Sequence, residues 1–387
     1  MTIKNADLSV RALMEIDRNI DQLVKEIELL SYVNPVNIKE AKERFFRSKY
    51  LTDPEFIYPQ IDFDRFRLHR ELFIQPLEHI EDPETRQLYE DIIYTYSGLI
   101  QCIETIGSGR KFYYNCLHCF GTPTETDVEN AKFILHFEDQ DLDQERFVPK
   151  YSSIDTEPFF QAYSKQYDFD YRIEHSSKIS ASAMVLNNKR ALVLNENYMF
   201  SEHELNVLNN HEIGVHMVTT MNGLEHPLKI FSHGFPNYEE TQEGLAVFAE
   251  YMSNNLTVTR LKELAYRVIA VDSLAKGYDF SKTFRLLHNQ FDLDREQAFY
   301  ISLRVHRGGG FTKDYLYLTG LKKIYDRYKR GEDLSPLLTG KVSLEYLDVI
   351  QTLTEKGFAQ PSRFITDAYA SNSNQDETVD FILNNLK

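Results

Sequence analysis

The sequence predicts a helix-rich α+β chain with one small mixed sheet. Most segments repeat apolar residues at the spacing of an α-helix. Residues 179–194 instead alternate apolar and polar side chains around Asn187-Asn188, which is typical of a β-hairpin. The hairpin is followed by Ser201-Glu202-His203-Glu204, a capping box that opens a helix. The sheet is therefore expected beside that helix.

The N-terminal region is predicted to be a helical arm. Apolar residues from Leu8 to Leu30 recur at helical spacing, which predicts one amphipathic helix ending near Pro35. A second helix is expected over residues 37–48, before Pro54 interrupts the pattern. Residues 1–54 are therefore assigned to an arm that packs on the main body.

The rest of the chain is predicted to form one larger domain, residues 55–365, and a polar C-terminal tail, residues 366–387. A helix is expected from Asp82 to Ile106, and another after Pro123. Further helical patterns cover residues 201–216, 238–251, 261–274, 281–290, 295–306, 312–330 and 344–355.

The charge of this 387-residue chain disfavours several classes of partner. Its formal net charge is −16, so its surface repels nucleic-acid phosphates and anionic lipids. No apolar run approaches the roughly 20 residues that cross a bilayer, and charges occur throughout the first 30 residues.

The three cysteines are too few for a disulfide framework, and Cys116 and Cys119 lack a second pair to complete a zinc site. We expect a cytoplasmic protein whose cysteines are reduced core thiols.

The segment from His211 to His216 carries the clearest chemical signal. The zinc-peptidase signature His-Glu-x-x-His places two histidines about 40° apart on one helical face. Here the histidines are one residue further apart, which on a regular α-helix separates them by about 140°. They converge only if the helix departs from α geometry near Gly214, as in a π-bulge. Otherwise they are ordinary hydrogen-bonded histidines.

A catalytic zinc site needs a third protein ligand. Glu243, at the start of a later helix, is the first candidate, and the adjacent Gly244 and Ala246 are expected to let that helix pack closely on the first. The alternative is that Glu243 only complements the helix dipole. His226 ranks second as a ligand, and His233 and Glu250 are also near in sequence.

Two motifs together resemble a known family. His211-Glu-Ile-Gly-Val-His216, followed by Gln242-Glu-Gly-Leu-Ala246, resembles the QEGLA-motif proteins. Bacterial members carry the label of modulators of flavohemoglobin expression, and animal relatives are microtubule-associated tyrosine carboxypeptidases. The resemblance extends from about Glu55 to Phe364. It implies a zincin-like, gluzincin-type fold and a Zn²⁺ ion held by His211, His216 and Glu243, with Glu212 as the general base.

A carboxypeptidase also needs a cation for the terminal carboxylate of its substrate. Arg304, Arg307 and Lys313 lie beside a Gly-rich turn, and each is a candidate, while Tyr317 is a candidate donor to the oxyanion. The alternative for each cation is a salt bridge within this acidic protein. The strand from Lys178 to Val185 is a candidate for pairing with the substrate backbone.

These features predict a zinc carboxypeptidase that removes one C-terminal residue, with tyrosine as the residue that the resemblance implies. Its expected partner is the C-terminus of a peptide or protein, and its oligomeric state is not predicted. An endopeptidase or aminopeptidase would use the same metal ligands. A catalytically silent zinc-binding regulatory protein of the same fold is the main alternative, and a helical interaction protein with an accidental motif is another.

Overall fold

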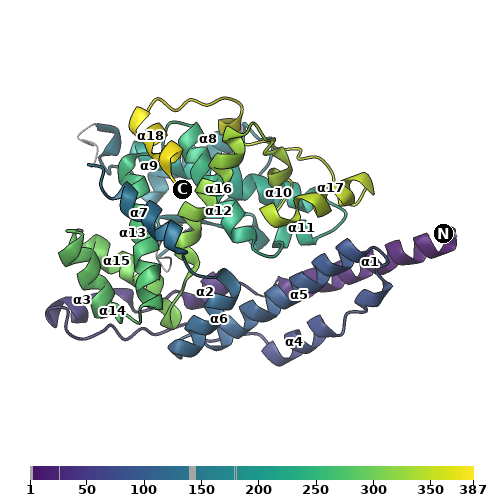
Figure 1. Ribbon diagram of the computed structural model, residues 1–387, viewed down its shortest axis with the longest axis horizontal. Helices are drawn as coiled ribbons and strands as arrows, with labels where there is room; N and C mark the ends of the chain where they lie inside the picture. The colour runs from purple at the N-terminus through teal and green to yellow at the C-terminus, as the bar shows by residue number, and fades with distance from the viewer. Residues whose placement is uncertain (1–2, 26, 139–144, 178, 180) are drawn as a thin grey trace.

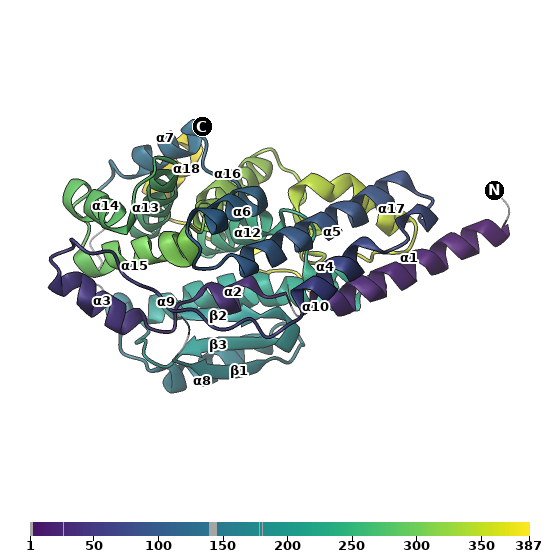
Figure 2. The same ribbon diagram turned by 90° about the horizontal axis from the view of Figure 1, so that it is seen from below.

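Helices form most of the protein (Figure 1), and one small sheet lies at its side (Figure 2). The computed structural model describes residues 3–25, 27–138, 145–177, 179 and 181–387. The helices are α1 (Ile3–Val24), α2 (Leu29–Val33), α3 (Ile38–Arg47), α4 (Arg65–Phe73), α5 (Pro83–Glu104), α6 (Arg110–Phe120), α7 (Glu125–Ile134), α8 (Ser153–Ser164), α9 (Glu202–Leu208), α10 (Val218–Glu225), α11 (Ile230–His233), α12 (Tyr238–Met252), α13 (Val258–Ala275), α14 (Phe280–Arg285), α15 (Arg295–His306), α16 (Leu316–Lys329), α17 (Leu347–Glu355) and α18 (Glu377–Asn385). None of the helices in these residues is long and apolar enough to cross a membrane.

The sheet is mixed and three-stranded, with β1 (Arg172–Ser176), β2 (Ala183–Leu186) and β3 (Ala191–Asn195) in the order β1-β3-β2. The predicted hairpin is confirmed, because β2 runs antiparallel to β3 and pairs Ala183 with Leu194. Its first strand begins later than predicted, and Lys178 and Ser180 lie outside the described residues. The parallel strand β1 was not predicted from the sequence.

The N-terminal region differs from the single predicted helix. It forms α1 and then the short α2, which packs against α5 and buries Leu29 and Val33. Between the two helices the Ile27 amide donates to the Val24 carbonyl at 2.9 Å. Tertiary packing therefore divides a segment whose local pattern is continuous, and the predicted boundary after residue 54 stays a prediction.

The C-terminal residues are packed rather than extended. The helix α18 buries Val379, Ile382 and Leu383 in the larger hydrophobic core, and Leu386 follows them. Its polar residues face outward, so the composition of this segment resembles that of a tail although one face is apolar.

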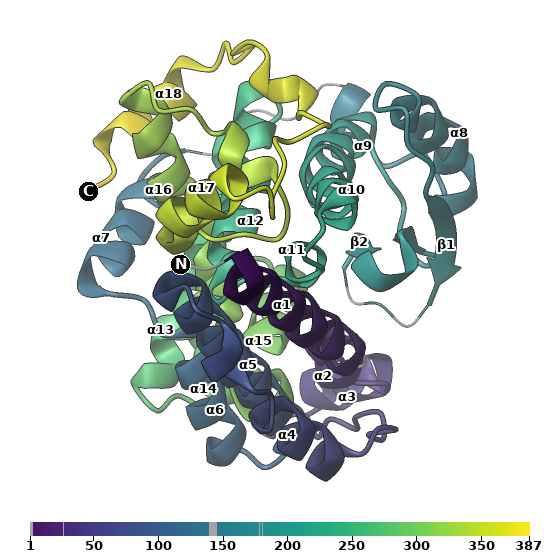
Figure 3. The same ribbon diagram turned by 90° about the vertical axis from the view of Figure 1, so that its right-hand side faces the viewer.

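Two hydrophobic cores meet at the helix that carries the histidine motif. The larger core lies among the helices and includes Val215. The smaller core lies under the sheet and α8 and includes Ile213 and Met217. Figure 3 shows α9 and α10 between the sheet and the main group of helices. The motif is thus held from both sides.

The three cysteines are free and lie together between α5 and α6. The Cys102 sulfur is 4.0 Å from that of Cys116 and 3.6 Å from that of Cys119. The thiol of Cys116 raises the pKa of Cys102, the thiol of Cys102 raises that of Cys119, and burial adds to both shifts, which keeps both thiols protonated.

Candidate metal centre

The predicted departure from α geometry is present. One continuous helix runs from Glu202 to Glu225, and its central residues Asn209–Met217 form a π-helix, η4. Ser201 opens it with the predicted capping box. The wider turn brings the rings of His211 and His216 to 5.0 Å between centroids.

Side chains from outside this π-helix donate hydrogen bonds to its backbone carbonyls, and two of them come from the C-terminal part of the chain. The Thr366 hydroxyl donates to the Gly214 carbonyl at 2.6 Å. The Lys341 amine donates to the His216 carbonyl at 2.8 Å, and the Thr220 hydroxyl does so at the same distance. These donors satisfy acceptors whose positions differ from those of a regular helix, so tertiary contacts stabilise the wider turn.

Gly214 contributes less than the sequence indicated. Its φ is not positive, so the position does not require glycine. A β-carbon there would contact only the Asn209 carbonyl at 3.4 Å and two side-chain atoms beyond it. The wider turn therefore rests on its hydrogen-bond partners and not on the flexibility of glycine.

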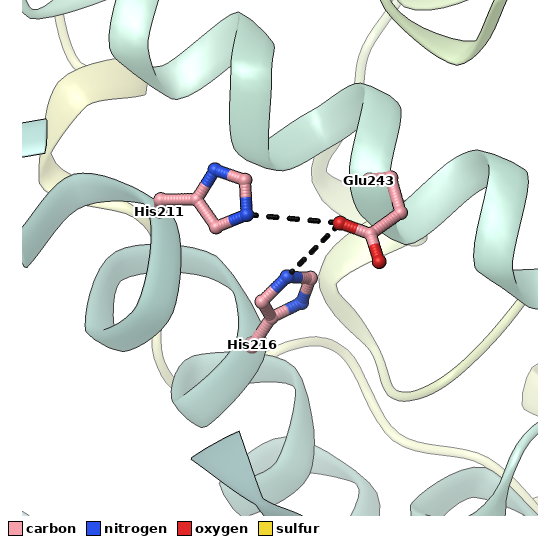
Figure 4. A group of neighbouring side chains, drawn as sticks. All are labelled: His211, His216 and Glu243. Carbon is pink, nitrogen blue, oxygen red and sulfur yellow. Dashed lines mark ion pairs between the residues drawn. The ribbon is translucent and has the colours of Figure 1, made fainter. Parts of the chain in front are cut away.

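Helix α12 brings Glu243 to the two histidines (Figure 4). Its Oε2 atom is 3.7 Å from Nε2 of His211 and 3.5 Å from Nε2 of His216. One ligand atom from each residue lies within 4.8 Å of the other two. A tetrahedral zinc with bonds of about 2.0–2.1 Å separates its ligand atoms by about 3.3 Å. The spacing and the residue types therefore fit a zinc ion.

The Glu243 carboxyl group is held in its ionised form. Burial alone would raise the pKa of this carboxyl, but Lys313, His211 and His216 outweigh burial and hold it well below its usual range. Its Oε1 atom accepts a hydrogen bond from Lys313. Its buried Oε2 atom has no hydrogen-bond partner among the described residues. A buried acceptor in this state is suited to a metal ion.

Glu250 orients His211 from behind. Nδ1 of His211 lies 2.8 Å from Oε1 of Glu250, whose other oxygen contacts Arg260 at 3.2 Å. Burial opposes ionisation of Glu250, but Arg260 and His211 outweigh it and lower the pKa of the carboxyl. Because an ionised carboxylate only accepts, Nδ1 donates and Nε2 is left to face Glu243.

The other candidate ligands lie elsewhere. Nε2 of His226 bonds to the Thr339 carbonyl, and its Nδ1 accepts from the Gln360 amide. His233 pairs with Asp21 at 2.6 Å. Both rings are thus engaged outside the group formed by His211, His216 and Glu243.

A cavity of about 240 Å³ opens beside the three residues and is lined by Glu212. Arg304, Arg307, Lys313 and Tyr317 also line it, so the structure gathers all the predicted site residues around one space. The candidate substrate-binding residues differ in their ion-pair and hydrogen-bond partners, and these partners distinguish their possible roles.

Two of the three cations are already paired. Arg304 donates through Nε and one terminal nitrogen to Asp314, and Lys313 donates to Glu243. Arg307 instead donates to the side-chain oxygen of Asn34 and lies over the Phe311 ring at 4.7 Å.

Arg307 is a buried cation without an ion pair. It is 5% exposed, and no carboxylate of the described residues lies within 4.0 Å of it. Burial is the main reason that its pKa falls to about 10, and its Nε atom has no hydrogen-bond partner in the described parts of the chain. Burying a charge without a counterion is costly, so this group is suited to an anionic ligand.

Tyr317 lies beside the histidines because α12 and α16 cross closely. Its ring is nearly parallel to that of His211, with centroids 6.4 Å apart. A β-carbon on Gly244 would lie 2.4 Å from Gly320 of α16. Gly244 therefore permits close approach of α12 to α16. The sequence had led us to expect that this glycine would instead permit close packing on the histidine helix.

Sequence reasoning did not identify the supporting residues Lys341, Thr366 and Asn34, and it considered Glu250 only as a ligand. Lys341 is a buried lysine between the short 3-10 helices Ser335–Leu338 and Leu344–Tyr346, and Glu250 is a buried carboxylate two turns after Glu243 on α12. Such charges are weak signals of a site. Thr366 and Asn34 have no distinguishing local pattern.

A comparison with protein families agrees with these observations. The model of the microtubule-associated tyrosine carboxypeptidase family matches residues 43–387. No curated protein matches the chain. Because the family model spans nearly all of the sequence, including the histidine helix and α12, this chain belongs to the microtubule-associated tyrosine carboxypeptidase family.

Proposed function

We propose that the chain is a zinc-dependent, zincin-type carboxypeptidase that removes the last residue of a peptide or protein. The observation that carries this proposal is the convergence of His211, His216 and Glu243 beside a cavity that also contains the unpaired cation Arg307. Tyrosine is the proposed terminal residue, because the family is named for removing it.

His211, His216 and Glu243 are the proposed ligands. Two imidazoles and one carboxylate form a donor set that is common in zinc peptidases and leaves one position for the reaction. When bound, the ion supplies a Lewis acid that acidifies water and polarises the scissile carbonyl. Glu250 keeps the first imidazole in the tautomer that presents Nε2.

Glu212 is the proposed general base. It follows His211 directly and lines the cavity, and its carboxylate has no hydrogen bond or ion pair within the described residues. It accepts a proton from the attacking water and then returns this proton to the amine of the leaving residue.

Strand β2, Tyr317 and Arg307 are the parts of the cavity wall that hold the substrate. Strand β2 is an edge strand, and Ala183, Met184 and Val185 line the cavity, so its free edge can pair with a peptide backbone. The Tyr317 hydroxyl, whose pKa is raised by burial, stays protonated and can donate to the oxyanion. Arg307 binds the terminal carboxylate and thereby gains the anion that it lacks.

The test compares the wild type with Glu212→Gln on peptides with varied C-terminal residues. Mass spectrometry should show products one residue shorter for the wild type. Glu212→Gln should reduce the rate by about 10²–10⁴-fold and retain one zinc per chain, because a general base contributes about that factor. Equal cleavage by both proteins, or a zinc content that His211→Ala leaves unchanged, would contradict the proposal.

A further inference from the structure

The N-terminal arm forms part of the cavity wall. Val24, Ile27, Glu28, Leu29, Leu30 and Asn34 line the same cavity as the histidines. All of them precede residue 43, where the family match begins. One wall of the candidate site is therefore supplied by a segment outside the matched region.

This wall is firmly attached to the rest of the protein. The buried Asp17 carboxylate accepts hydrogen bonds from the backbone amides of Lys229 and Ile230 and from the Tyr89 hydroxyl. Asp21 pairs with His233, and Val33 is fully buried. With these anchors in both α1 and α2, the segment is a fixed boundary of the cavity rather than a loose cover.

Asn34 presents a neutral acceptor to Arg307. Its amide nitrogen donates to the Leu30 carbonyl at 2.9 Å, which fixes the orientation of the side chain. Its amide oxygen is then the atom that accepts from Arg307. A neutral acceptor orients a guanidinium without neutralising it, so the charge of Arg307 is kept for a ligand.

We propose that residues 24, 25 and 27–34 close the cavity beyond Arg307, and that Asn34 positions this guanidinium to select substrates with a free C-terminal carboxylate. The arm thereby limits the enzyme to terminal residues and excludes chains that continue past the scissile bond. This inference rests on the proposed carboxypeptidase function and adds the element that makes it an exopeptidase.

The test uses Asn34→Asp in the full-length, zinc-loaded protein. An aspartate would pair with Arg307 and occupy the place of the substrate's carboxylate. The probes are benzoyl-glycyl-tyrosine and its C-terminal amide. The wild type should prefer the free acid, and Asn34→Asp should reduce the acid-to-amide ratio of kcat/KM by about tenfold or more, the worth of a charge-assisted hydrogen bond. The loss should lie in KM for the acid.

Asn37→Asp is the matched control. Asn37 also lies in the arm, but its side chain bonds to the backbone of Glu55 and Ile57 and does not line the cavity. It should leave the acid-to-amide ratio unchanged. Thermal unfolding should show that Asn34→Asp is no less stable than the wild type, because it gives Arg307 an ion pair.

Binding separates this inference from the proposed function. In a Glu212→Gln background, calorimetry should show tighter binding of the acid than of the amide, and Asn34→Asp should remove that preference. The inference is overturned if the wild-type arm accepts the amide equally, if Asn34→Asp keeps the preference, or if Asn37→Asp removes it as well. Absence of hydrolysis by the wild type would refute the peptidase function, while the binding preference would still decide the role of Asn34.

Discussion

The described residues contain two π-helical segments that differ in almost every other respect. The segment η4 lies in the middle of a long helix, and all of its residues except His216 are buried. The segment η5, Leu286–Gln290, continues α14 at its C-terminal end, and only Leu287 is buried. Both contain histidine, yet only η4 brings ligands together.

The source of their hydrogen bonds explains the difference. In η5 the partners are local, since the Phe291 amide donates to the Leu286 carbonyl and His288 bonds to the Leu293 carbonyl. In η4 the partners Lys341 and Thr366 come from more than 100 residues away. In η4 these distant donors add to local ones, such as the Thr220 hydroxyl on the His216 carbonyl. Those distant donors, more than the turn itself, mark the candidate site.

The largest expected effect comes from removing a ligand from η4. His216→Ala should abolish the proposed hydrolysis and lower the zinc content below one per chain, because two residues remain to hold the ion. The matched change in η5, His288→Ala, should alter neither. Metal analysis and peptide assays on both variants check this, and a stoichiometric zinc in His216→Ala would remove the distinction between the two segments.

A smaller effect is expected from the distant donor. Thr366→Val leaves the Gly214 carbonyl buried without its hydroxyl partner, which should cost about 1–3 kcal/mol of unfolding free energy. Zinc affinity should fall about tenfold, as for other residues that support ligands. Thr354→Val removes a local bond within α17, to the carbonyl of Ile350 one turn earlier, from a half-buried side chain, and should change the stability by less than about 0.5 kcal/mol. Equal effects in denaturant titrations would show that η4 does not depend on this contact.

Proton release on zinc binding should also distinguish His211, one of the two histidines in η4. Burial disfavours the charged form of His211, but the neighbouring carboxylates of Glu243 and Glu250 outweigh it and raise the pKa to about 9 in the metal-free protein. Zinc binding must displace this proton. Between about pH 6.5 and pH 9, affinity should therefore rise with pH by up to tenfold per unit.

The same shift fixes the sign of the metal-free stability. A pKa raised above the unfolded value stabilises the folded state below pH 6.5, and this contribution is lost as the pH rises through about 9. Chelated protein should consequently melt at a lower temperature at pH 9 than at pH 7. Chelator competition and thermal melts measure both effects, and a pH-independent affinity would contradict them.

The smallest expected effect is that of Gly214→Ala. The position has ordinary helical φ and room for a methyl group, so alanine should be neutral or stabilise by up to about 1 kcal/mol. Zinc content should be unchanged. Loss of zinc in this variant would show that η4 does depend on glycine, and that its hydrogen-bond partners are not sufficient.

Much of the fold was predictable because it follows from local patterns. The helices α3, α12 and α15 lie close to where the apolar spacing places them. The parallel strand β1 was missed, because its pairing with β3 depends on a segment about 20 residues away. The division of α1 from α2 was missed for a similar reason, since packing against α5 overrides a continuous local pattern.

The sequence by itself determined that His211 and His216 could converge only if their helix departed from α geometry, because the angle between two residues of one helix depends only on their spacing. Only the tertiary structure decided which cation stays available. Arg304, Arg307 and Lys313 are alike in sequence, but Asp314 and Glu243 neutralise two of them, and Asn34 leaves the charge of Arg307 intact. Charge pairing depends on where distant segments meet, and the spacing of residues along the chain does not reveal these contacts.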